Sequence, residues 1–260
     1  MLDQRLDPKS NHLLCALTGA EWQRWEPQLE VVDLTLGQVL YESGLQQSHV
    51  YFPTTAIVSL LYLTADGASV EISAVGREGA VGISLFVGGR LASGRGVVLV
   101  AGQGVRIGSQ VIQEELERAG LAANLLLRYS QALMTQIAQT VVCNRHHTLD
   151  QQLCRLLLVI LDCQPRSEFL MTHERIAHVL GVRREGVSEA AHRLQAAGLI
   201  HYTRGHISVL DRRGLERRTC ECYAVVREEY HRLLPAAAKA RTGSVAPRPL
   251  PAQTLEALDA

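Results

Sequence analysis

The fold of this protein is decided by residues 171–200, which read MTHERIAHVLGVRREGVSEAAHRLQAAGLI. Thr172 is a favourable N-cap residue, and the apolar residues from there to Leu180 share one face of a helix. Gly181 supplies the left-handed residue that commonly ends a helix. After a short turn, apolar residues again recur at helical spacing until Gly198. Two short helices joined by a glycine-containing turn form a helix-turn-helix.

A β-hairpin is predicted directly after these helices. Residues 200–202 and 207–209 are β-prone, and they flank the segment 203–206, which contains a glycine for the turn. A hairpin in this position is a wing. Between residues 164 and 235 the sequence has 12 arginines against 9 acidic residues, although the whole chain has a formal net charge of +0. A modest local excess of positive charge therefore accompanies the winged helix-turn-helix.

Helix-turn-helix units also occur as packing units, but the wing and the basic excess favour binding of double-stranded DNA. The second helix is the one expected in the major groove, where arginine pairs with guanine and glutamate accepts from cytosine. Helix N-termini such as the one at Thr172 supply donors to phosphate. The residues predicted to contact DNA are Thr172, His173, Arg183, Arg184, Glu185, Ser188, Arg204 and His206.

The first half of the chain has a different pattern, because 13 of the 21 glycines lie between Gly37 and Gly108. Short segments of β-prone residues separated by glycine turns are typical of an all-β barrel, sandwich or roll. The predicted strands are Ile57 to Leu63, Val70 to Val75, Val97 to Val100 and Val105 to Ile107.

A long amphipathic helix is predicted between the two regions, over residues 118–147, and a second helix over 148–162. The apolar stripe of the long helix either packs against the β domain or forms the seam of a homodimer, and the length of this helix favours the dimer. The residues predicted for this seam are Leu125, Tyr129, Leu133 and Ile137.

The sequence therefore predicts an α+β fold: an N-terminal arm (1–12), a β-roll (13–117), the long helix (118–147), a winged helix-turn-helix domain (148–235) and a flexible tail (236–260). The N-terminus lacks the apolar segment of a secretory signal, so we expect a cytoplasmic protein that does not enter membranes. The six scattered cysteines indicate reduced thiols, and their spacing predicts no zinc site. No catalytic motif is present, so we expect no enzyme.

This order of elements resembles the Crp/Fnr family of regulators from residue 13 to 234. The most specific part is the segment 181–194, GVRREGVSEAAHRL, in which Arg184, Glu185 and Val187 match the family's recognition helix. Gly186 replaces the usual threonine, and Glu189 replaces a second basic residue, which implies an altered DNA site. The resemblance implies a homodimer, a jelly-roll-like sensor domain related to cyclic-nucleotide-binding domains, and RNA polymerase as a partner if the protein is an activator.

When this sequence is compared with the family, its segment 76–84, GREGAVGIS, falls where cyclic-nucleotide binders hold the ligand. Gly82 is followed by Ile83 instead of glutamate, and an apolar side chain cannot accept hydrogen bonds from a ribose. The segment thus disfavours cyclic AMP, and we expect the effector to be another molecule or to be absent. A cyclic nucleotide stays a less favoured candidate. An iron–sulfur cluster is also disfavoured, because only Cys15 precedes residue 143. The candidate effector residues are Arg77, Glu78, Gly82, Arg95 and Thr140. The alternative function is a ligand sensor that acts through protein contacts.

Overall fold

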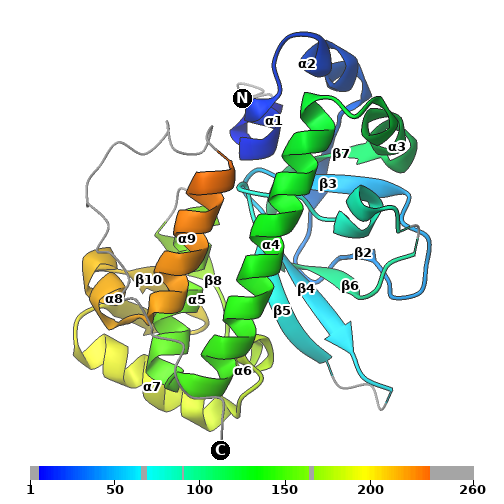
Figure 1. The fold of residues 1–260 in the computed structure, drawn as a ribbon. Helices are drawn as coiled ribbons and strands as arrows, with labels where there is room; N and C mark the ends of the chain where they lie inside the picture. Colours follow the sequence, from blue (N-terminus) through cyan, green and yellow to red (C-terminus); the bar gives the residue numbers. More distant parts are fainter. Residues whose placement is uncertain (1–5, 66–68, 90, 164–166, 235–260) are drawn as a thin grey trace, which may run out of the picture.

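A computed structural model describes residues 6–65, 69–89, 91–163 and 167–234 of the chain. It shows two lobes, with antiparallel sheets on one side of a long helix and a mainly helical lobe on the other (Figure 1). The predicted α+β fold class is confirmed. The predicted flexible tail, residues 236–260, lies outside the described residues, as does the proline-containing break at 164–166.

The N-terminal segment is helical, which the sequence analysis did not predict. It contains the 3₁₀ turns η1 (Pro8–Ser10) and η2 (Glu26–Gln28) and the helices α1 (His12–Ala16) and α2 (Gly19–Trp25). The Asn11 carboxamide caps α1, and its nitrogen donates to the carbonyls of Pro53 and Gly79 at 2.9 and 2.8 Å. This buried side chain therefore anchors the N-terminal helices to the β domain.

The β domain consists of two antiparallel sheets with strand orders β1-β7-β3 and β2-β6-β4-β5. The four predicted strands are present with shifts of a few residues at their ends. The strands are β1 (Glu30–Leu34), β2 (Val39–Tyr41), β3 (His49–Pro53), β4 (Ile57–Leu63), β5 (Ser69–Val75), β6 (Arg95–Val100) and β7 (Gly102–Gly108), followed by helix α3 (Ser109–Arg118). A 3₁₀ turn, η3 (Ile83–Val87), lies between β5 and β6.

The long helix α4 (Leu121–His146) crosses the molecule and separates the β domain from α9 (Glu221–Leu233; Figure 1). Leu125, Tyr129 and Leu133 are buried in the core of the β domain, and Ile137 packs against the same cluster. The hydroxyl of Tyr129 donates to the carbonyl of Ala80 at 2.7 Å. The predicted dimer seam is therefore corrected: these four side chains pack within their own chain, and the alternative, packing on the β domain, applies.

A second stripe on α4 is exposed. Leu127, Met134 and Val141 are 52, 62 and 64% exposed and are spaced by seven residues. Asn124, Gln131, Ala138 and Arg145, which complete the heptad pattern between them, are exposed as well. Side chains at heptad spacing lie along one line of a helix, so α4 presents a continuous free face with an apolar residue in every second turn.

The C-terminal lobe surrounds helix α5 (Leu149–Cys163), whose leucines are buried except for the partly buried Leu149. A small sheet with the order β8-β10-β9 completes its core. Its other elements are β8 (Glu168–Leu170), α6 (His173–Leu180), α7 (Arg184–Ala196), β9 (Ile200–Thr203), β10 (His206–Val209), α8 (Arg212–Arg218) and α9 (Glu221–Leu233). No helix among the described residues is long and apolar enough to cross a membrane.

Helix α9 was not predicted from the sequence, and it packs along α4 (Figure 1). The hydroxyl of Tyr230 on α9 donates to Oε1 of Gln136 on α4 at 2.8 Å, and its ring meets that of Tyr129 edge-on. The amide nitrogen of Gln136 donates in turn to the carbonyl of Ala74 on β5 at 2.8 Å. Helix α9 is thus connected to the β domain through one buried side chain of α4.

Candidate nucleic-acid interface

The helix-turn-helix consists of α6 and α7, and its local signals act as the sequence predicts. The hydroxyl of Thr172 caps α6 by accepting from the backbone N–H of Arg175 at 3.2 Å. Gly181 ends α6 with a φ of 66°, a left-handed conformation in which glycine is favoured. The predicted helix-turn-helix is confirmed.

The N-terminus of α7 carries the polar side chains that a groove-binding helix needs. Arg183 is the N-cap residue, and Arg184 and Glu185 begin the helix; all three are exposed. Val187 and Leu194 on the opposite face are fully buried. Burial of this apolar face fixes the rotation of α7, so the charged residues of its first turn point away from the core.

Gly186, in the same turn, lies close to the start of α5. A Cβ atom there would lie 3.0 Å from Cδ2 of Leu149 at the start of α5. A larger side chain would have to displace the end of that leucine. The glycine thus allows α5 and α7 to approach closely, which is a structural reason for its departure from the family pattern.

His173 and Ser188, both predicted to contact DNA, are half-buried and bonded to each other. Nδ1 of His173 lies 2.9 Å from the Ser188 hydroxyl, and its ring stacks on Tyr202 of the wing with centroids 4.0 Å apart. Burial, with help from the nearby Arg184 charge, lowers the pKa of His173. This histidine links α6, α7 and β9. Its geometry therefore favours a role in holding these three elements in place at the interface. Contact of either residue with DNA stays a prediction.

The wing is a tight hairpin with Arg204 and Gly205 at its tip. Both residues have positive φ, 45° and 84°, and the strands on either side pair from Thr203 to His206, as in a type I′ turn. The carbonyl of Gly205 accepts from the N–H of Met171 at 2.7 Å, which holds the wing beside the start of α6. Arg204 and His206 remain exposed.

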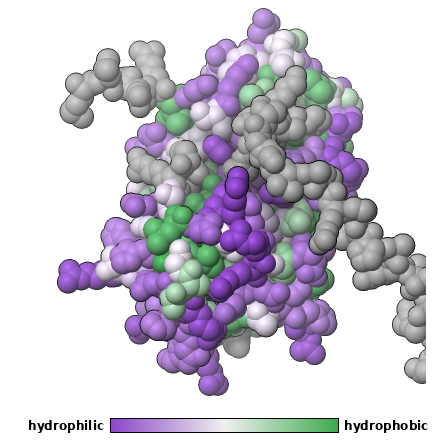
Figure 2. All heavy atoms as spheres, turned by 90° about the vertical axis from the view of Figure 1, so that its left-hand side faces the viewer, coloured by the Kyte–Doolittle hydropathy of each residue, from purple (hydrophilic) through white to green (hydrophobic). Residues whose placement is uncertain are grey.

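Other arginines of this lobe serve its architecture. Arg193 on α7 pairs with Asp150 on α5 at 2.6 Å. Arg175, half-buried, donates to the carbonyl of Val98 on β6 at 3.0 Å and so connects α6 to the β domain. Figure 2, which faces the side of α8 and α9, shows that hydrophilic residues dominate the lower part of this face, where the helix-turn-helix lobe lies.

A polar network holds the end of α5 to α8 and α9. Nη2 of Arg212 lies 2.7 Å from Oδ1 of Asp162, and the hydroxyl of Tyr223 donates to Oδ2 of the same carboxylate at 2.7 Å. Arg212 also donates to the Tyr223 oxygen at 2.8 Å. The carboxylate therefore anchors two later elements of the lobe.

The candidate effector residues do not form one cluster. The guanidinium of Arg95 is paired with Glu42 at 2.7 Å, so a phosphate would have to displace that carboxylate. Arg77 donates to the carbonyl of Asp162 at 3.2 Å, at the end of α5. Gly82 has a φ of 120° and precedes η3. The side chains of Arg95 and Arg77 therefore contact different neighbours.

Glu78 directly follows Arg77, whereas Thr140 lies on α4. Glu78 is held by the N–H of Gly76 at 2.8 Å and the thiol of Cys163 at 3.1 Å, and burial raises the pKa of its carboxyl. The Thr140 hydroxyl is buried, donates to the carbonyl of Gln136 and is approached by Arg155 at 3.4 Å. A pocket beside them is lined by residues of the 76–78 turn, α4, α5 and α9, among them Glu78, Gln136, Arg155, Asp162, Tyr223 and Tyr230.

The β domain contains another buried carboxyl, Glu71 on β5. It accepts a short hydrogen bond from the Ser59 hydroxyl on β4. Burial raises its pKa to about 7, and the hydrogen bond and the Arg155 charge only partly oppose this effect. Glu71 therefore binds a proton in the folded state more tightly than an exposed glutamate does.

Comparison with known proteins agrees with this geometry. Residues 151–218 match the Crp-like helix-turn-helix domain, whereas no curated protein sequence matches significantly. Three similar solved structures share the fold. One, described as a Crp/Fnr-family transcriptional regulator from Eubacterium rectale, has 17% identity and a TM-score of 0.61, with 79% of this chain and 96% of that chain covered.

The other two comparisons are FixK2 from Bradyrhizobium japonicum and a CRP-family transcriptional regulator from Thermus thermophilus. FixK2 has 15% identity and a TM-score of 0.60, with coverage of 74% of this chain and 98% of that chain. The Thermus protein has 20% identity and a TM-score of 0.59, with coverage of 72% of this chain and 95% of that chain. The resemblance inferred from the sequence is confirmed: the chain contains a Crp-like helix-turn-helix domain at residues 151–218 and has the fold of the Crp/Fnr regulators.

Proposed function

We propose that this protein is a transcription regulator that binds double-stranded DNA through α7 and the wing. The observation that carries the proposal is the exposure of Arg183, Arg184 and Glu185 at the N-terminus of a helix whose other face is buried. A forked guanidinium suits the acceptor pair of guanine, and a carboxylate suits the amino group of cytosine. Arg204 on the wing supplies positive charge for the flanking backbone.

The regulator acts as a homodimer whose seam is the exposed face of α4. Three observations support this part of the proposal: the heptad spacing of Leu127, Met134 and Val141, their exposure in the single chain, and the length of α4. A parallel pair of such helices would relate two recognition helices by a two-fold axis. The DNA site would then consist of two half-sites about 34–36 Å apart, one turn of the double helix.

Control of the regulator rests on a ligand other than cyclic AMP or on the apo protein itself. Two features support this view: Ile83 replaces the glutamate that holds a ribose, and Arg95 is already paired with Glu42. Removing a bound arginine from its carboxylate would cost binding free energy.

The proposal is tested by footprinting the purified protein on the DNA upstream of its own gene. Arg184→Ala should weaken specific binding by about 30-fold or more, because each lost bidentate contact costs about 1–3 kcal/mol and a dimer loses two. Non-specific binding should change little. Arg232→Ala removes an exposed arginine on α9 that pairs with Glu229, and it serves as the matched control.

A protected two-fold site that depends on Arg184 and weakens steeply with salt would support the proposal. No protected site on any genomic fragment, with a folded protein, would refute DNA binding. Equal losses from the Arg184 and Arg232 variants would refute base recognition by α7.

A further inference from the structure

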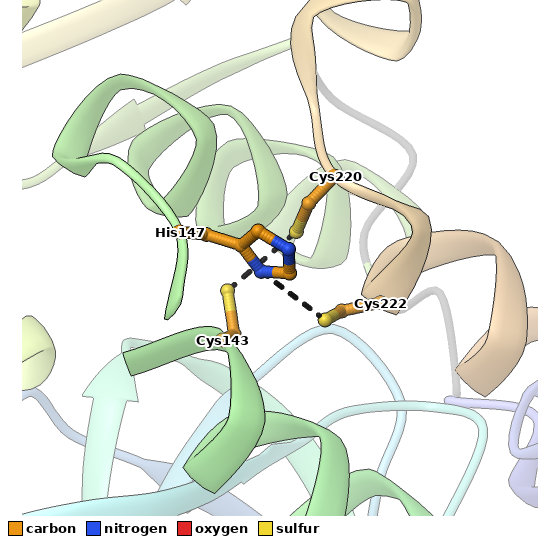
Figure 3. Close-up of side chains that lie close together, drawn as sticks. All are labelled: Cys143, His147, Cys220 and Cys222. Carbon is orange, nitrogen blue, oxygen red and sulfur yellow. Dashed lines mark hydrogen bonds between the residues drawn. The ribbon is translucent and has the colours of Figure 1, made fainter. Parts of the chain in front are cut away.

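Four metal-binding side chains converge where α4 ends and α9 begins. Cys143 lies in the last turn of α4, and His147 is the residue that caps this helix. Cys220 is the N-cap residue of α9, and Cys222 lies in its first turn. Figure 3 shows the four side chains pointing toward a common centre. Their ligand atoms all lie within 4.8 Å of one another, and the three cysteines are buried.

The separations fit one tetrahedral metal ion. Around a tetrahedral zinc, with bonds of about 2.3 Å to sulfur and about 2.0–2.1 Å to nitrogen, two sulfurs lie about 3.8 Å apart and a sulfur and a nitrogen about 3.5 Å apart. Here Sγ of Cys143 lies 3.6 Å from Sγ of Cys220, and Sγ of Cys222 lies 3.5 Å from Nδ1 of His147. An iron–sulfur cluster divides its four ligands between two or more iron atoms, so ligands on different irons need wider spacing.

The outer nitrogen of the histidine is also arranged as in metal sites. Nδ1 of His147 faces the thiols, while Nε2 lies 3.2 Å from a carboxylate oxygen of Glu221. A metal-binding histidine usually donates its other ring N–H to a carboxylate, which fixes the tautomer and the ring orientation. In addition, the Gln152 amide donates to the carbonyls of Cys143 and His147 at 3.3 and 2.9 Å, which holds the backbone between these two ligands.

We propose that Cys143, His147, Cys220 and Cys222 bind one divalent metal ion of the zinc class, with Glu221 orienting the histidine. Three thiolates and one imidazole are a soft ligand set that suits zinc and disfavours magnesium or calcium. The spacing of the cysteines in the sequence predicts no metal site, because Cys143 and Cys220 are 77 residues apart and only the fold brings them together.

The ion would add a second link between two elements that are already joined by packing and by the Tyr230–Gln136 hydrogen bond. Two ligands belong to the end of α4 and two to the start of α9, so the metal would fix α9 where the chain passes from the long helix into the helix-turn-helix lobe. Cys222 also lines the pocket beside α5 and α9.

The test uses the full-length protein, reduced and freed of metal, and titrated with Co²⁺ and then Zn²⁺. We expect one ion per chain, an absorption spectrum of tetrahedral cobalt with thiolate charge-transfer bands, and displacement of cobalt by zinc. Zinc should also protect three of the six cysteines from a thiol reagent and raise the melting temperature.

Variants identify the ligands. Stoichiometric binding should be abolished by each of four substitutions: Cys143→Ser, His147→Ala, Cys220→Ser and Cys222→Ser. The Cys15→Ser variant should bind normally, because Cys15 is an exposed cysteine near the N-terminus, far in sequence from the four ligands. Glu221→Gln should weaken zinc binding about 10- to 100-fold without changing the number of ions. If a cysteine variant does not fold, the cobalt spectrum and the thiol count of the unmodified protein decide whether thiolates bind the metal.

Three results would overturn the proposal. They are a folded, reduced protein that takes up no stoichiometric metal, a cobalt spectrum without thiolate bands, or a Cys143–Cys220 disulfide that persists under reducing purification. None of these measurements involves DNA, so a failure here is distinct from a failure of the proposed function.

Discussion

Met134→Glu tests whether the exposed face of α4 is the dimer seam. Met134 is 62% exposed in the single chain, so about two-thirds of its surface is available for burial by a partner. Full burial of a methionine side chain is worth about 1.5–3 kcal/mol, which leaves about 1–2 kcal/mol for each copy. The two-fold axis doubles the loss to about 2–4 kcal/mol, and the two facing glutamates repel each other. The dimer dissociation constant should therefore rise at least about 30- to 1,000-fold.

Sedimentation equilibrium over a range of protein concentrations measures this constant directly. Leu45→Glu is the matched control, because Leu45 is 61% exposed but belongs to the β domain, between β2 and β3. Circular dichroism should show unchanged helix content in both variants. If the Met134 variant dimerises as tightly as the unmodified protein, or if the Leu45 variant weakens the dimer equally, then the seam lies elsewhere.

Three further predictions concern stability, each measured by urea unfolding. The Glu71 carboxyl has a pKa of about 7 when folded against an ordinary 4.5, so the folded state holds a proton that the unfolded state has already lost, and it loses stability as pH rises from about 4.5 to 7; Glu71→Gln should remove this loss of at most about 3 kcal/mol, and an unchanged pH profile would disprove it. Gly205→Val should destabilise the chain by about 1–3 kcal/mol, because a β-branched residue is strained at a φ of 84°; no change would mean that the wing rearranges. Tyr223→Phe removes the hydroxyl between Arg212 and Asp162 and should cost about 1–2 kcal/mol; a neutral effect would show that water replaces it.

The helix-turn-helix was predictable because its signals are local. Thr172 caps its own helix, Gly181 ends that helix, and the turn at Gly205 needs only the residues beside it. Each of these features follows from the conformational preferences of one or two residues, and each is present in the structure. The strands of the β domain were predictable for the same reason, since alternation and glycine turns are properties of short segments.

The faces of α4 were not predictable in the same way. An apolar stripe such as Leu125 and Tyr129 shows that a side of the helix is buried, but it does not show whether the covering surface belongs to the same chain. The exposed heptad stripe is weaker in sequence, because polar and small residues alternate with Leu127, Met134 and Val141. The cysteine–histidine cluster escaped prediction because its two halves meet only through the packing of α9 on α4.

The arrangement of α4 suggests how the two lobes of the proposed regulator affect each other. One side of the helix is bound to the β domain through Tyr129, a second side carries α9, and a third is free for a partner chain. Gln136 spans the first two, because its amide bonds both Ala74 of β5 and Tyr230 of α9. These hydrogen bonds are buried, so breaking them without replacement is costly. A shift of β5 relative to α4 must therefore either move α9 with it or break this chain of bonds, and a metal ion at the start of α9 would favour the first outcome.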